Sequence, residues 1–162
     1  MFVATHPLNI PTAYHRPIGQ LLVRWGVTEL YLQSIVWHIW KIQDPKTARL
    51  LTWDLNAVAK VKLFEYLAPR WITDVNDRAE LKGIADMADK LRTRRNHVAH
   101  GVWGCKPGDA KTVYLIHTAR EKRIQPKAER VTVADVKGWA ADLNELNRRL
   151  VKFHRKLGAP AP

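Results

Sequence analysis

The sequence predicts an all-α fold, a single helical bundle of about four to five helices with a small β or loop excursion before the last helix. The length of 162 residues suits one domain with one core. Apolar residues recur at spacings of three, four and seven over four segments. Between residues 104 and 130 this pattern gives way to Pro, Gly, Lys and β-branched residues. We therefore expect one helical domain over residues 1–158 and a frayed tail at 159–162.

The first half of the chain is expected to hold three helical segments. A long amphipathic helix begins after Pro17 and runs to about residue 40, and a short helical turn covers residues 48–51. Asp54 or Asn56 caps a third helix, and Pro69 ends it after Leu67. The inward positions of the two longer helices are expected to be Leu21, Trp25, Leu32, Ile35, Ile39, Val58, Val61, Leu63, Phe64 and Leu67.

A fourth helix is expected to start near Asp77 and to stop at Gly101. Its apolar face is expected to comprise Leu81, Ile84, Met87 or Ala88, Leu91 and Val98. Beyond it, the alternating residues 112–118 predict a short strand, and residues 122–124 are its candidate hairpin partner.

Thr132 and Asp135 resemble a capping box at the start of a final helix. Its apolar residues follow a heptad pattern: Val136, Trp139, Leu143, Leu146, Leu150, Phe153 and Leu157. The pattern fits an intrachain bundle helix and a dimer seam equally well.

The formal net charge of +12 indicates an anionic partner, with nucleic acid favoured over an anionic membrane surface. The charge is concentrated in residues 91–130, where ten Lys/Arg face three Asp/Glu, a net of +7. No apolar run approaches the roughly 20 residues of a membrane span, and residues 1–12 lack the pattern of a secretory signal. We therefore expect a cytoplasmic protein. Its one cysteine, Cys105, forms neither an internal disulfide nor a multi-thiolate metal site.

A short motif lies in the last turns of the fourth helix. Arg95 is followed directly by Asn96 and stands five residues before His100. This spacing resembles the RNxxxH form of the motif of the HEPN family. The segment Gly19 to Leu30 and the closing amphipathic helix also resemble that family, so the resemblance spans most of the chain.

The resemblance implies an all-helical fold, often a homodimer with the motif in a shared cleft. For active members it implies metal-independent endoribonuclease activity in toxin–antitoxin, abortive infection or antiviral defence systems. Other members only bind RNA or a partner protein, so a catalytically inactive binding module is the alternative. A third possibility is an interaction subunit that inhibits or docks onto a nucleotidyltransferase or toxin partner through the C-terminal heptad helix. The possible protein partners are therefore an antitoxin, if the chain is a toxin, or a nucleotidyltransferase.

The motif residues have the chemistry of RNA cleavage without a cofactor. When the 2′-hydroxyl attacks the adjacent phosphate, the reaction needs proton transfer and cationic stabilisation. His100 exchanges protons near neutral pH, Arg95 offers a permanent fork-shaped charge to phosphate oxygens, and Asn96 orients the phosphate or the imidazole.

Helix geometry separates these groups. At 100° per residue, Asn96 and His100 lie about 40° apart, whereas Arg95 and His100 lie about 140° apart. Either the helix ends before His100 and turns it back, or the two roles come from different chains across a dimer cleft.

Arg95 also falls inside the apolar stripe, where a buried guanidinium needs a carboxylate. Glu29 interrupts the apolar face of the first helix and is the expected partner. This structural role is compatible with phosphate binding if Glu29 fixes the guanidinium.

His97 and His100 form an H-x-x-H pair, but no third ligand has suitable spacing, so we expect no metal. The expected RNA-binding residues are Arg92, Arg94, Trp103, Lys106, Lys111, Arg120, Lys122 and Arg123.

Overall fold

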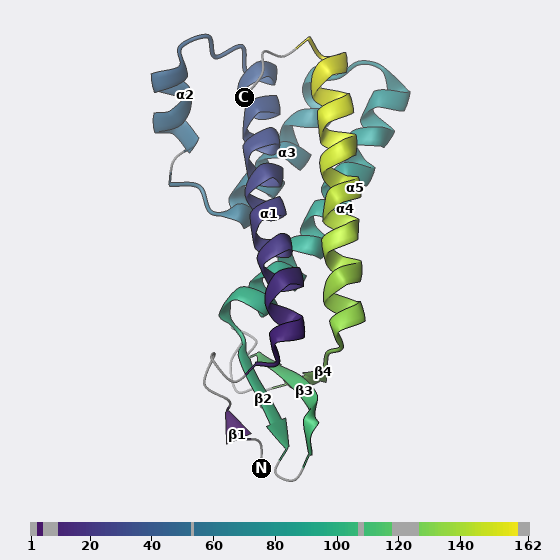
Figure 1. The fold of residues 1–162 in the computed structure, drawn as a ribbon. Helices are drawn as coiled ribbons and strands as arrows, with labels where there is room; N and C mark the ends of the chain where they lie inside the picture. Colours follow the sequence, from purple (N-terminus) through teal and green to yellow (C-terminus); the bar gives the residue numbers. More distant parts are fainter. Residues whose placement is uncertain (1–2, 5–9, 53, 107–108, 118–126, 159–162) are drawn as a thin grey trace. The chain divides into compact units, whose positions relative to one another are not determined.

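The computed structural model describes residues 3–4, 10–52, 54–106, 109–117 and 127–158 (Figure 1). Within these residues the chain forms five helices and a small four-stranded sheet, which confirms the all-α fold with a β excursion before the last helix. None of the described helices is long and apolar enough to cross a membrane. The helices are α1 (Thr12–Ile39), α2 (Pro45–Thr52), α3 (Ala57–Trp71), α4 (Val75–His100) and α5 (Val133–Lys156).

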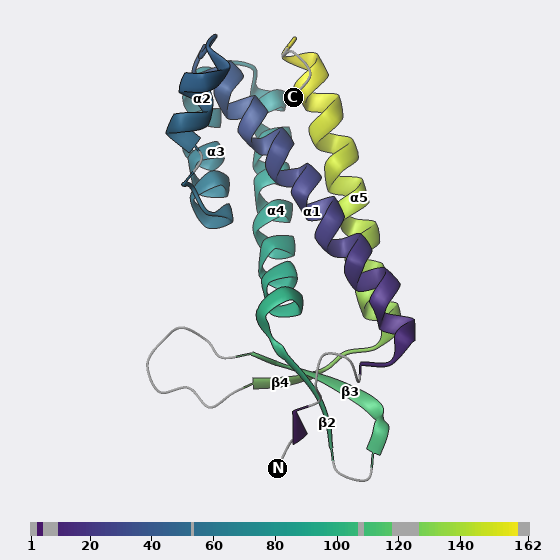
Figure 2. The ribbon, with the colours of Figure 1, turned by 60° about the vertical axis from the view of Figure 1, so that its left-hand side comes forward.

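The chain divides into two compact units. One comprises residues 1–23 and 93–141, and the other comprises residues 24–92 and 142–162. The boundaries fall within α1, α4 and α5, so each of these helices contributes to both units. The first unit holds the sheet, and the second holds α2 and α3 (Figure 2).

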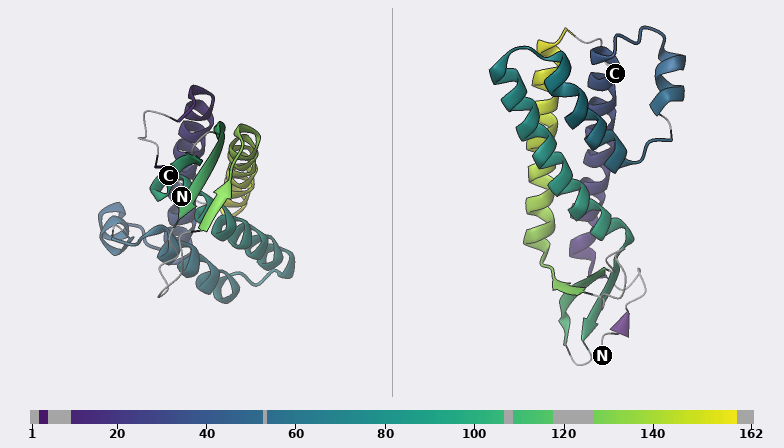
Figure 3. Two further views of the ribbon diagram at one scale, coloured as in Figure 1. Left: turned by 90° about the horizontal axis from the view of Figure 1, so that it is seen from below. Right: turned by 180° about the vertical axis from the view of Figure 1, so that it is seen from behind.

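The sheet of the first unit is antiparallel, with strand order β1-β2-β3-β4. Figure 3 shows its green strands from below and from behind. Its strands are β1 (Val3–Ala4), β2 (Val102–Lys106), β3 (Asp109–His117) and β4 (Lys127–Arg130). The predicted strand at 112–118 coincides with most of β3. Both neighbours of β3 are strands that the sequence did not predict, β2 and β4. The predicted hairpin partner at 122–124 lies outside the described residues.

Helix α1 begins at Thr12, so the prediction of a start after Pro17 is wrong. The buried Tyr14 explains the earlier start, because its hydroxyl donates to the carbonyl of Val131 at 2.9 Å. Its ring also meets Trp103 edge-on, with centroids 5.9 Å apart. A proline in a helix loses one backbone hydrogen bond. The buried contacts of Tyr14 hold the first turns helical in spite of that loss.

Local side-chain caps start the helices of the second unit. Asp44 accepts hydrogen bonds from the backbone N–H groups of Lys46 and Thr47 ahead of α2. Asn56 accepts a hydrogen bond from the N–H of Ala59 at 3.0 Å. Of the two caps expected for α3, Asp54 and Asn56, the structure therefore has Asn56. Asp74 caps α4 in the same way, which places the start of that helix at Val75 rather than near Asp77.

Helix α3 continues to Trp71, so the prediction that Pro69 ends it is wrong. A proline removes the bond from its own nitrogen to the carbonyl four residues earlier and crowds that carbonyl, and here both effects fall in the final turn of the helix. The last turn is also held by Arg70, whose Nη1 donates to the carbonyl of Tyr66 at 3.0 Å. The same guanidinium lies 3.6 Å from the centre of the Tyr66 ring.

The capping box of α5 is confirmed. The Asp135 carboxylate accepts from the N–H of Thr132 at 2.7 Å, and the Thr132 hydroxyl oxygen accepts from the N–H of Asp135 at 3.1 Å. Five of the seven heptad residues are at most 2% exposed within a single chain. They are Val136, Leu143, Leu146, Leu150 and Phe153. The heptad pattern therefore belongs to an intrachain helix, and these residues are not available as a seam between chains.

His154 makes the stability of the second unit depend on pH. Burial and, to a smaller extent, His38 lower the pKa of this buried imidazole, which hydrogen-bonds Ser34 and meets the Tyr31 ring edge-on. The unfolded chain then binds a proton near pH 6.5 that the folded chain does not. We expect the contribution of His154 to the free energy of unfolding to be constant above about pH 7 and to fall below pH 6.5, by at most about 1.4 kcal/mol per pH unit.

Urea unfolding of the wild type and of His154→Gln between pH 7.5 and 5.5 checks this expectation. The variant should lose part of the pH dependence, since glutamine does not titrate. Equal pH profiles for the two proteins would contradict the assignment to His154.

Candidate functional site

The three motif residues lie in the last two turns of α4, in the first unit. The helix extends through His100, and the N–H of Gly101 still donates to the carbonyl of His97 at 2.8 Å. The helix therefore does not end before His100, and the first of the two arrangements expected from the sequence is excluded. Arg95 and His100 point in directions about 140° apart around one helix axis.

Gly101 ends α4 as predicted, and the reason is lack of space. A Cβ atom at this position would lie 2.4 Å from the carbonyl oxygen of His97 and 2.7 Å from Cδ1 of Leu115. It would also lie 3.1 Å from the carbonyl oxygen of Ile116. The φ of Gly101 is not in the left-handed region. Glycine is thus needed because α4 passes directly into β2 against the backbone of β3.

Arg95 and Asn96 interact with each other. Nη1 of Arg95 donates to Oδ1 of Asn96 at 3.0 Å, and both residues are half-buried. Nε of Arg95 is buried and has no hydrogen-bond partner among the described residues. A buried donor without a partner costs about 1–3 kcal/mol, so this guanidinium is incompletely satisfied within one chain.

His100 is exposed at the last helical position, and His97 is half-buried one turn earlier. Within the described part of the chain, no three His, Cys, Asp or Glu side chains gather as a metal site would require. His100 is therefore accessible to solvent.

The predicted ion pair between Arg95 and Glu29 stays a prediction, because the two residues belong to different units. Within its own unit, Glu29 accepts a hydrogen bond from Nε1 of Trp25 at 2.5 Å. Its other carboxylate oxygen lies 3.7 Å from Nζ of Lys60.

Two of the arginines expected to bind RNA form ion pairs within the chain. Arg92 donates through Nε and Nη2 to Asp89, at 2.9 and 2.7 Å. Nη1 of Arg94 lies 2.8 Å from both carboxylate oxygens of Glu129, and its guanidinium lies 5.1 Å from the centre of the Trp139 ring. Arg94 thereby joins α4 to β4 and α5, a structural role that the sequence analysis missed.

Trp103, which the sequence analysis places among the RNA-binding residues, is buried in the first unit. The residue is 7% exposed, its Nε1 donates to the carbonyl of Val98, and its ring packs against Tyr14. A base could reach this indole only if it left the core. Lys106 and Lys111 belong to strands β2 and β3, but the structure does not describe their side chains. The other three expected RNA-binding residues lie outside the described residues: Arg120, Lys122 and Arg123.

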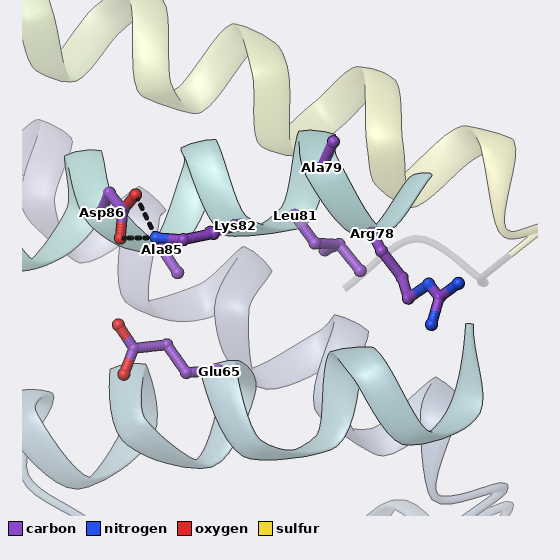
Figure 4. A pocket seen from close by; sticks show the side chains of 7 residues that line it. All are labelled: Glu65, Arg78, Ala79, Leu81, Lys82, Ala85 and Asp86. Carbon is purple, nitrogen blue, oxygen red and sulfur yellow. Dashed lines mark hydrogen bonds and ion pairs between the residues drawn. The ribbon is translucent and has the colours of Figure 1, made fainter. Parts of the chain in front are cut away.

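The second unit contains a cavity of about 550 Å³ between α3 and α4 (Figure 4). Its lining has an apolar base at Leu81 and Ala85, and Lys82 is paired with Asp86 across one turn of α4. Glu65 reaches the cavity from α3. The predicted site residues do not occur among the described residues that line it. The cavity and the motif are therefore separate features of the chain.

Comparisons with family models, with curated proteins and with solved structures found no match to this chain.

Proposed function

We propose that this chain is a metal-independent endoribonuclease of the HEPN type that acts as a homodimer. In each active site, Arg95 and Asn96 come from one chain and His100 from the other. The single observation that carries the proposal is that α4 remains helical through His100. Because one helix cannot direct Arg95 and His100 at the same phosphate, a second chain has to supply one of them.

The proposed chemistry uses the 2′-hydroxyl of the substrate as the nucleophile. His100 accepts the proton of this hydroxyl while its oxygen attacks the adjacent phosphorus. Arg95 stabilises the negative charge that develops on the phosphate oxygens. The bond from phosphorus to the 5′-oxygen breaks, and that oxygen takes up a proton from water. The hydroxide that remains removes the proton from the His100 imidazolium, which restores water and the neutral imidazole. The products are a 2′,3′-cyclic phosphate and a 5′-hydroxyl.

The state of Arg95 supports this role. Its Nη1 is held by Asn96, so the orientation of the guanidinium is fixed before a substrate arrives. Its Nε is buried without a partner among the described residues, whereas the residue as a whole is only half-buried and its guanidinium keeps a permanent positive charge for a phosphate. Preorganised donors of this kind stabilise a transition state without a further cost of reorganisation.

The charge distribution supports RNA as the substrate, since residues 91–130 carry a net charge of +7 around the motif. A cytoplasmic toxin or defence nuclease, kept silent by a neutralising antitoxin, fits such an activity. The rival in which the C-terminal heptad helix docks onto a nucleotidyltransferase is weakened, because the heptad residues are buried in their own chain.

Matched RNA and DNA oligonucleotides, incubated with the protein in EDTA, test the proposal. We expect RNA to be cut and DNA to be bound in a salt-sensitive way but left intact, because DNA lacks the 2′-hydroxyl. Mass spectrometry should find 2′,3′-cyclic phosphate ends or their hydrolysed form. Activity that disappears with EDTA and leaves 5′-phosphate ends would indicate a metal nuclease. RNA binding without cleavage would establish the inactive binding module instead.

A further inference from the structure

Helix α3, which lies wholly in the second unit, carries a stripe of two cations and one aromatic ring on its outer side. Lys62, Tyr66 and Arg70 follow one another at intervals of four residues, and all three are exposed. They lie within about 80° around the helix axis and span about 12 Å along it. Phe64, which is fully buried, lies about 160° from Tyr66. These three residues, the α3 stripe, therefore face away from the core of the unit.

Tyr66 and Arg70 form a stacked pair. The guanidinium carbon of Arg70 lies 3.6 Å from the centre of the Tyr66 ring, and Nη1 donates to the carbonyl of Tyr66 at 3.0 Å. The hydrogen bond holds the guanidinium over the ring. Tyr66 is nevertheless 57% exposed. The pair therefore presents flat π surfaces to solvent, and the bases of single-stranded RNA stack on aromatic rings and on guanidinium planes of this kind.

The fold does not neutralise the positive charges of the α3 stripe. Lys60, on the other side of the same helix, has its Nζ 3.7 Å from a carboxylate oxygen of Glu29. In the part of the chain that the structure describes, no carboxylate forms such a pair with Lys62 or Arg70. Both side chains are thus available to the phosphate groups of a nucleic acid.

The pattern fits a nucleic acid better than a membrane surface. A helix that enters a lipid surface needs a continuous apolar face. The large hydrophobic side chains that α3 exposes are Tyr66 and Trp71, and they lie about 140° apart around the helix axis. The ring of Tyr66 also lies between two cations along the stripe. A positive surface with an aromatic ring in it is instead typical of proteins that bind single strands.

We infer that the α3 stripe binds single-stranded RNA, with a base stacked on the Tyr66–Arg70 pair and a phosphate bound by Lys62. The inference rests on the proposed function for the identity of the nucleic acid, and it adds a binding surface outside the Arg95, Asn96 and His100 site.

Binding of an RNA strand that the protein is unable to cut tests the inference. A labelled 2′-O-methyl RNA oligonucleotide has no 2′-hydroxyl nucleophile, and fluorescence anisotropy measures its dissociation constant. An abasic strand of the same length keeps the phosphates but offers no base for stacking. Tyr66→Leu removes the ring and keeps an apolar side chain that favours helix. Trp71→Leu is its matched control, because it removes an exposed aromatic ring of α3 from outside the stripe.

Tyr66→Leu should raise the dissociation constant of the strand with bases at least about fivefold, the lower end of the usual effect of losing one stacking side chain. The same variant should change binding of the abasic strand much less. Tyr66→Trp and Trp71→Leu should bind like the wild type. Lys62→Gln should weaken binding of both strands and reduce the dependence of log Kd on log salt concentration by about one unit.

Circular dichroism checks that each variant keeps its helicity. The inference is wrong if folded Tyr66→Leu binds the strand with bases like the wild type, or if Trp71→Leu weakens binding as much. An unchanged salt dependence in Lys62→Gln would also overturn it, whatever the folding of the tyrosine variant. Sedimentation with phosphatidylserine vesicles covers the other class of partner. Vesicle binding that Tyr66→Leu abolishes, with RNA binding unchanged, would assign the stripe to a membrane surface.

The outcomes separate this inference from the proposed function, because binding of the uncleavable strand does not depend on catalysis. RNA binding that requires Tyr66, in a protein that cuts no RNA, supports the α3 stripe and refutes the ribonuclease. RNA cleavage together with binding that ignores Tyr66 and Lys62 refutes the stripe and leaves the ribonuclease standing.

Discussion

Mixing Arg95→Ala protein with His100→Ala protein should restore ribonuclease activity that neither variant has alone. If each site combines Arg95 of one chain with His100 of the other, a mixed dimer keeps one intact site and one site that lacks both residues. Random exchange of subunits makes half of the dimers mixed, so the mixture should recover about a quarter of the wild-type rate. His100→Ala alone should lose about 10²–10⁴-fold, the usual contribution of a proton-transfer residue. Arg95→Ala alone should lose about 10²–10³-fold, the usual contribution of a group that stabilises charge in the transition state.

This experiment depends on subunit exchange and on correct folding of both variants. Mass spectrometry of an isotope-labelled subunit measures the exchange, and circular dichroism checks the helicity of each protein. His100 is exposed, so its replacement by alanine should leave both helicity and RNA affinity nearly unchanged. If exchange is complete and the mixture remains inactive, both residues act within one chain and the composite site is wrong. Full activity of His100→Ala alone would remove His100 from the site altogether.

Gly101→Ala should lower the free energy of unfolding by about 2–3 kcal/mol, the upper range for overpacking a core position. The new methyl group would lie 2.4 Å from the carbonyl oxygen of His97 and 3.1 Å from that of Ile116. Both are backbone atoms, one in α4 and one in β3, so neither moves aside as a flexible side chain does. Relief of the contact has to displace the junction between α4 and β2, which also carries His100.

Urea unfolding of Gly101→Ala measures this effect, with Gly138→Ala as the control. The control adds the same methyl group where no described atom lies within 4 Å, and it should stabilise the chain by up to about 1 kcal/mol. Equal stability of the two variants would show that the end of α4 has more room than the contacts of Gly101 indicate.

From the sequence alone, the helical segments, the caps of α3 and α5 and most of the inward positions of the long helices could be predicted. Asn56 and the pair Thr132 and Asp135 were identifiable because a cap is made within three residues of the chain. The buried positions of α5 were predictable because helical periodicity is local. The motif and its spacing were also apparent in the sequence. So was the angle of about 140° that separates Arg95 from His100 around the axis of a single helix.

Other features depend on residues that are far apart in sequence, and these are visible only in the folded structure. Tyr14 starts α1 before Pro17 because it bonds to Val131, 117 residues away. Arg94 is paired with Glu129, 35 residues away, and Trp103 is buried against Tyr14 instead of facing RNA. Strands β1, β2 and β4 are short, and each is defined by its antiparallel neighbours in the sheet. A local sequence pattern shows which residues share a face of a helix or strand. The contacts of Tyr14, Arg94 and Trp103 are instead stabilised by residues that come close only when the chain has folded.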